Sequence, residues 1–159
     1  MKQAEASCLQ SDPGTSFEMK TKIFAAVEMT LSGRRILVVE DDYLISMDVL
    51  DALSQAGAEV VGPVAKLSSA LCHIEHGSFD AAVLDIKLND GLVFPAADRL
   101  ANSGVPFVFL SGYDSQFIPE RFSTIPLFLK PYDDSVLVEG LCGLLSVSCR
   151  KASSQRVCT

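Results

Sequence analysis

The sequence predicts an α/β fold built on a five-stranded parallel β-sheet. Five short apolar runs alternate with segments in which apolar residues recur every three or four positions. Short apolar runs between helices are typical of strands that are buried on both faces, as in a parallel sheet. The expected strands are residues 36–39, 60–64, 81–84, 106–110 and 125–129.

Length and composition favour one domain with a hydrophobic core, because the chain has 159 residues of which 48% are hydrophobic. The net charge of -7 argues against a nucleic-acid partner, since phosphate contacts need clustered Lys and Arg. No apolar run reaches the roughly 18 residues of a membrane span. Five cysteines without a CxxC pair favour a reduced, cytoplasmic chain.

The first 33 residues are expected to form an N-terminal extension that is partly flexible. Residues 1–17 mix Ser, Asp, Pro and Gly with scattered charge and show no period. Residues 17–31 have the apolar spacing of one amphipathic helix, which Gly33 would end.

The helix after the first strand has signals at both ends. Asp41 or Asp42 is expected to cap its N-terminus, and Gly57 to end it. Apolar residues fall on one face of this helix, which should pack on the sheet. They are Ile45, Val49, Leu53 and Ala56.

The middle of the chain repeats the alternation. A second helix is expected from Ser68 or Ser69 to a stop at Gly77. Residues 86–93 are expected as a loop, because Asn, Asp and Gly at 89–91 are turn residues. A third helix should then cover 94–101.

The last third predicts one weak helix and one long helix. Residues 113–124 carry Pro119 where a helix would need an amide donor, so a helix there should be weak. The last helix should begin at the aspartates 133–134 and end near Val147, leaving 148–159 as a tail. It carries more apolar residues than one buried stripe needs, which suggests a partner or dimer surface.

Polar residues follow four of the expected strands. Glu40 and Asp41 follow the first strand, Asp85 the third, Ser111 the fourth and Lys130 the fifth. Because ligands of such sheets bind at the carboxyl ends of the strands, these side chains should surround one point. Two carboxylates about 4 Å apart repel by roughly 4 kcal/mol at an effective dielectric constant of about 20, so three of them need a cation or a proton. Mg²⁺ fits a cluster of oxygen ligands, and the absence of Cys and His disfavours zinc.

These residue types suit phosphoryl chemistry. Lys130 and Ser111 could stabilise the outer oxygens of a phosphoryl group as a cation and a hydroxyl donor. Asp85 is then the natural nucleophile, because a carboxylate can accept phosphate as an acyl phosphate.

Four motifs, in order, resemble a response-regulator receiver domain of two-component signalling. They are ILVVEDD at 36–42, VLDIKLNDG at 83–91, LSG at 110–112 and LKPY at 129–132. The resemblance covers residues 34–147 as the receiver domain. It implies a flavodoxin-like fold with helices on both faces of the sheet and the strand order 2-1-3-4-5.

The resemblance also implies a role for each site residue. Asp85 would be the phosphoacceptor, Asp41 a direct Mg²⁺ ligand, Glu40 a ligand acting through water, the Lys87 carbonyl the backbone ligand, Ser111 the switch hydroxyl and Lys130 the partner of the phosphoryl group.

One position departs from the usual receiver. Receivers usually carry Tyr or Phe three residues before the lysine, and here that position is Leu127. Residues 106–113 resemble the PFxFATGY signature of the FAT GUY receivers, which lack this aromatic switch. Leu110 and Ser111 stand where the signature has Ala and Thr.

The leading hypothesis is a stand-alone receiver that takes a phosphoryl group from the phosphohistidine of a sensor histidine kinase. It would signal to a downstream protein or pass phosphate to a histidine phosphotransfer domain, with slow self-dephosphorylation but no ordinary enzyme activity. Two alternatives remain: an adaptor that is never phosphorylated, and a phosphatase of the haloacid dehalogenase type. The latter needs a second Asp where Lys87 stands. His73 and His76, which share a helix face, are interpreted as solvated histidines.

Overall fold

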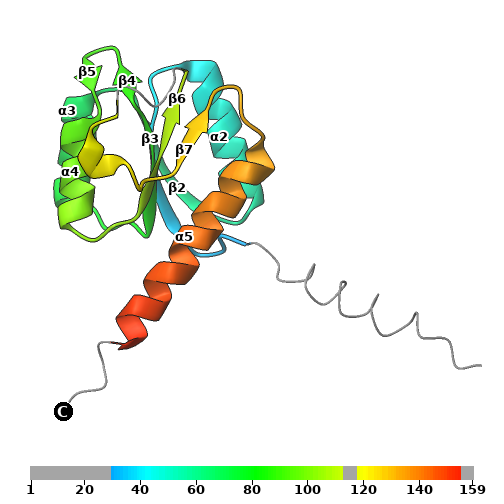
Figure 1. Ribbon diagram of the computed structural model, residues 1–159. Helices are drawn as coiled ribbons and strands as arrows, with labels where there is room; N and C mark the ends of the chain where they lie inside the picture. The colour runs from blue at the N-terminus through cyan, green and yellow to red at the C-terminus, as the bar shows by residue number, and fades with distance from the viewer. Residues whose placement is uncertain (1–29, 113–117, 155–159) are drawn as a thin grey trace, which may run out of the picture.

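The computed structural model describes residues 30–112 and 118–154, with side chains as far as residue 147. Five parallel strands form one sheet in the order β2-β1-β3-β6-β7 (Figure 1). They are β1 (Arg35–Val39), β2 (Glu59–Val64), β3 (Ala81–Asp85), β6 (Phe107–Ser111) and β7 (Leu127–Leu129). When only the five strands of this sheet are numbered in chain order, the strand order is 2-1-3-4-5. Both the predicted fold class and the predicted strand order are therefore confirmed.

Helices cover both faces of the sheet (Figure 1). They are α2 (Tyr43–Gln55), α3 (Leu67–His76), α4 (Phe94–Asn102) and α5 (Asp134–Ser154). Successive strand residues point to opposite faces, so each strand contributes to two cores. On β1, Leu37 and Val39 pack in the core under α3 and α4, while Ile36 and Val38 pack in the core under α2 and α5.

The ends of α2 follow their sequence signals. Asp42 is the N-cap, and its carboxylate accepts hydrogen bonds from the backbone amides of Leu44 (2.9 Å) and Ile45 (3.1 Å). Beyond the other end, Gly57 has φ +85°, a left-handed conformation that favours glycine. The choice between Asp41 and Asp42 as the cap is therefore settled, and Asp41 is left for the strand-end cluster.

The expected loop at 86–93 is instead a small antiparallel hairpin of β4 (Lys87–Leu88) and β5 (Gly91–Leu92). Gly91 takes φ +144°, which lets the chain reverse direction at this turn. Leu88 is buried in the core under α3 and α4, which holds the hairpin against the domain. The backbone amide of Leu67 donates to the two carboxylate oxygens of Asp90 in the turn, Oδ1 at 2.9 Å and Oδ2 at 3.0 Å. The hairpin thereby caps α3, whose own N-cap residue makes no side-chain bond.

Ordered structure continues beyond residues 34 and 147. Leu31 is fully buried and its amide donates to the carbonyl of Ala56, so the packed unit includes residues before 34. At the other end α5 continues past Val147 to Ser154, because residues 148–154 contain neither Gly nor Pro to stop it. The expectations for residues 1–29 and 155–159 lie outside the described residues.

The weak helix expected at 113–124 is described only in part. Residues 113–117 lie outside the description, and Glu120–Phe122 form a single 3-10 turn, η2, directly after Pro119. None of the helices in the described ranges is both long and apolar enough to cross a membrane.

Gly140 lets α5 approach the strand that leads to Lys130. A Cβ atom at Gly140 would lie 2.5 Å from Cζ of Phe128 on β7, whereas a Cβ atom at Gly143 would have no neighbour within 4 Å. The close contact between α5 and β7 therefore depends on a missing side chain.

We predict opposite effects of alanine at these two glycines. Gly143→Ala should raise the free energy of unfolding by up to about 1 kcal/mol, because alanine favours the helix. Gly140→Ala gains the same helix propensity, but its methyl group overpacks against Phe128. This substitution should lower the free energy of unfolding by about 1–3 kcal/mol. Urea unfolding measures both, and equal effects would show that α5 does not need the close approach.

Candidate functional site

Two neighbouring strands bring three carboxylates together. Glu40 and Asp41 follow the end of β1, and Asp85 is the last residue of β3. The two strands are in register, with Val39 opposite Leu84, so both end at the same level of the sheet. One carboxylate oxygen of each acid lies within 4.8 Å of the others. The structure thus assembles the acidic cluster that the sequence predicted.

Lys130 provides the positive charge in this cluster. Its Nζ lies 2.6 Å from Oε2 of Glu40 and 3.2 Å from Oδ2 of Asp85. Glu40 is 2% exposed and Asp85 7% exposed, so water screens these ion pairs far less than it screens surface pairs. One ammonium therefore serves two buried acids, which leaves the cluster with excess negative charge.

Both oxygens of Glu40 are engaged by the protein. Oε2 accepts from Lys130, and Oε1 accepts from the backbone amide of Asp42 at 3.0 Å. Each oxygen keeps a second lone-pair site, so these two bonds orient the carboxylate without filling it. Action through a water molecule, as expected for Glu40, leaves both bonds in place.

The other expected site residues surround the cluster. Ser111 ends β6 and is buried, and its backbone carbonyl accepts from the amide of Lys130 at 2.8 Å. That bond fixes where the lysine leaves the sheet. Lys87 follows Asp85 by two residues and is exposed on β4. The expected role of its carbonyl as a backbone ligand stays a prediction.

The charge state of Asp85 reflects this environment. Its pKa is raised from 3.8 to about 6, first by burial and then by the charge of Glu40, while Lys130 opposes the rise. The free chain thus holds a carboxylate that is costly to ionise. A bound cation would stabilise the ionised form.

The donor set fits Mg²⁺. The three carboxylates are hard oxygen ligands, which Mg²⁺ prefers. No Cys or His belongs to this group, so its chemistry does not match the sulphur and nitrogen ligands of zinc sites.

Tyr132 is the last residue of the LKPY motif, and the sequence had suggested no role for it. Its hydroxyl is buried and has no hydrogen-bond partner in the described structure. Burial, and then the charge of Glu40, raises its pKa. With Lys130, Asp48 and Asp134 it lines a groove of about 330 Å³. Its place two residues after Lys130 was the only signal that could have pointed to it.

We predict that Asp85 makes stability depend on pH when no divalent ion is present. Because folding raises its pKa to about 6, ionised Asp85 destabilises the folded state, and that penalty grows between about pH 4 and pH 6. Asp85→Asn should therefore match the wild type at low pH and become more stable than it above pH 6. Urea unfolding of both proteins across this range tests this, and a difference independent of pH would contradict it.

No family model matches the chain. A curated relative is the transcriptional regulatory protein PdtaR of Mycobacterium tuberculosis H37Rv, which is 29% identical over 114 residues. The match covers 68% of this chain and 55% of PdtaR, so the chain spans about half the length of that relative.

Solved structures give a closer match. SdrG from Sphingomonas melonis Fr1 is 36% identical, with a TM-score of 0.64, and the match covers 70% of this chain and 96% of SdrG. The receiver domain of the sensor histidine kinase PA1611 from Pseudomonas aeruginosa PAO1 has the same fold at 22% identity, with a TM-score of 0.65 and coverage of 72% and 99%. SdrG also fits the FAT GUY subgroup that the sequence resembles. The chain belongs to the response-regulator receiver family.

Proposed function

We propose that Asp85 accepts a phosphoryl group from the phosphohistidine of a sensor histidine kinase, with Mg²⁺ as the cofactor. The observation that carries this is the packing of Asp85 against two further acids, with the ammonium of Lys130 only 3.2 Å from its carboxylate. In this proposal Asp85 is the nucleophile, the acids hold a divalent cation and Lys130 supplies a positive charge, all within one cluster of side chains.

In the proposed reaction an Asp85 oxygen attacks the phosphorus of the donor. The phosphorus–nitrogen bond breaks, the imidazole of the donor leaves with its electron pair, and an acyl phosphate forms on Asp85. The nucleophile must be ionised, and a pKa of about 6 leaves most of Asp85 ionised at neutral pH. Lys130 can turn from Glu40 towards the new phosphoryl oxygens, because its Nζ already contacts both acids.

Asp41, Asp85 and the Lys87 carbonyl would hold Mg²⁺, with Glu40 acting through water. The ion would neutralise negative charge on the phosphoryl oxygens. Ser111 would supply a hydroxyl to these oxygens from the end of β6 and act as the switch residue.

Two relatives support the chemistry. SdrG has been solved in a BeF3-activated conformation, at 37% identity to this chain. The PA1611 receiver has been solved with a magnesium ion coordinated in its active-site cleft. The acidic cluster of this chain could hold such an ion.

For output we propose contacts with a downstream protein, or transfer of phosphate to a histidine phosphotransfer domain. Exposed apolar side chains are available for such contacts on two helices. Tyr43 and Leu44 on α2 are more than 70% exposed, at 72% and 73%, and Val136 and Val147 on α5 are 47% and 56% exposed. Val136 and Val147 belong to the surplus of apolar residues that the sequence predicted for this helix. The same surface could instead form the contact of a homodimer.

A phosphatase of the haloacid dehalogenase type is disfavoured. Such an enzyme needs an acid two residues after its nucleophile, and Lys87 occupies that position on β4.

We predict that the protein gains the mass of one phosphoryl group when it is incubated with Mg²⁺ and acetyl phosphate. Asp85→Asn should abolish the gain, because it removes the nucleophile. The matched control is Asp42→Asn, which keeps a capping side chain for α2 and should leave the gain intact. No gain in the wild type would favour the adaptor, and a gain that persists in Asp85→Asn would show that another residue accepts phosphate.

A further inference from the structure

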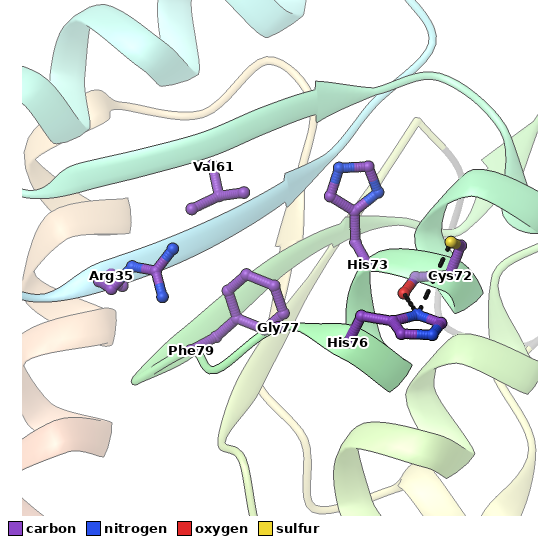
Figure 2. A pocket seen from close by; sticks show the side chains of 7 residues that line it. All are labelled: Arg35, Val61, Cys72, His73, His76, Gly77 and Phe79. Atoms are coloured by element: carbon purple, nitrogen blue, oxygen red, sulfur yellow. Dashed lines mark hydrogen bonds between the residues drawn. The ribbon is translucent and has the colours of Figure 1, made fainter.

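A second cluster of reactive side chains lies far from Asp85 along the sheet. The last turns of α3 border a groove of about 300 Å³ whose other walls include Arg35, Val61 and Phe79 (Figure 2). Arg35 is the first residue of β1, whereas the acidic cluster follows the last residue of that strand. The groove therefore lies towards the amino-terminal edge of the sheet, away from the candidate phosphoryl site.

Cys72 and His76 form a close pair on α3. They are one helical turn apart, and Sγ of Cys72 lies 3.8 Å from Nδ1 of His76 (Figure 2). Both side chains are exposed. An ion bonded at about 2.3 Å to sulphur and about 2.1 Å to nitrogen would separate these atoms by about 3.6 Å in tetrahedral and about 3.8 Å in trigonal geometry. The pair already has the spacing of two ligands of one metal ion.

We propose that Cys72 and His76 bind a thiophilic transition-metal ion, of the class of Cu(I) or Zn²⁺. A thiolate with an imidazole selects such ions, in contrast to the oxygen ligands around Asp85. The pair lies in the last turns of α3, where the helix dipole favours a cation. Solvent completes the coordination, since the groove is open to water. This site is independent of the proposed phosphoryl transfer.

Metal binding requires two proton movements. The Cys72 thiol loses its proton to solvent as the sulphur–metal bond forms. Nδ1 of His76 donates its proton to the carbonyl of Cys72, 2.9 Å away, so metal binding at Nδ1 breaks this hydrogen bond and the ring proton moves through solvent from Nδ1 to Nε2. One proton is released for each ion bound. Arg35 cannot serve as a ligand, because its protonated guanidinium offers no lone pair; it instead donates to Glu59 at 3.1 Å and to the Ser78 carbonyl at 2.9 Å.

His73 provides a matched control within the same helix. It is exposed like His76, and its Nδ1 makes the same type of contact with a helix carbonyl, that of Ser69 at 2.8 Å. Its ring, however, is turned away from Cys72 and towards Val61 (Figure 2). Loss of His73 should therefore leave the pair intact.

The test is a titration of the reduced, untagged full-length chain with Co²⁺ in the presence of excess Mg²⁺, which keeps the acidic cluster occupied. We expect a near-ultraviolet band from thiolate-to-cobalt charge transfer that saturates at one equivalent. Cys72→Ser should abolish the band, and His76→Ala should weaken apparent binding about 100-fold, because the second donor is lost. His73→Ala and Cys142→Ser should bind as the wild type does.

Three results would overturn the proposal. One is the absence of the band in the wild type, and another is its persistence in Cys72→Ser, which would assign it to another cysteine. The third is an equal loss of binding in His73→Ala and His76→Ala. Circular dichroism of each variant checks that these exposed substitutions leave the fold unchanged, and phosphorylation with acetyl phosphate should proceed in all of them.

Discussion

The shared ammonium of Lys130 is the interaction on which the candidate site depends. Glu40 and Asp85 are both buried, and a single positive charge contacts both of them. Buried charges are tolerated only when they are paired and hydrogen-bonded. The fold meets this condition by ending β1, β3 and β7 around one point. With Asp41 counted, three acids share one ammonium, and this excess of negative charge is the electrostatic reason for a divalent cation. Burial first, and then the charge of Glu40, raises the pKa of Asp85.

Much of this could be predicted from the sequence, because apolar periodicity and strand-end residues are local signals. The strands, the cap at Asp42 and the group Glu40, Asp41 and Asp85 follow from such signals. The strand order came from the family resemblance and not from the pattern. The pairing of Lys130 with Glu40, the hairpin that caps α3 and the contact of Gly140 with Phe128 join distant segments. Such contacts depend on tertiary geometry, which local patterns do not specify.

Leu127 changes how a signal could leave the site. It lies on β7 opposite Phe109 and packs, half-buried, against a core that contains four phenylalanines. Phe122, the last residue of η2, is one of these, and its ring centroid lies 5.6 Å from that of Phe109. A leucine here cannot act as a rotating aromatic switch. The amide of Lys130 donates to the Ser111 carbonyl at 2.8 Å, so the backbone joins these two expected site residues directly.

The most direct test of the charge arrangement is the affinity for Mg²⁺ in the absence of phosphodonor. If Lys130 is the cation that occupies the acidic cluster, then Lys130→Met removes a competitor for Glu40 and Asp85. Isothermal titration calorimetry should then show Mg²⁺ binding that is on the order of tenfold tighter than in the wild type, or more. Unchanged or weaker binding would contradict the assignment of these three acids and Lys130 to one metal site.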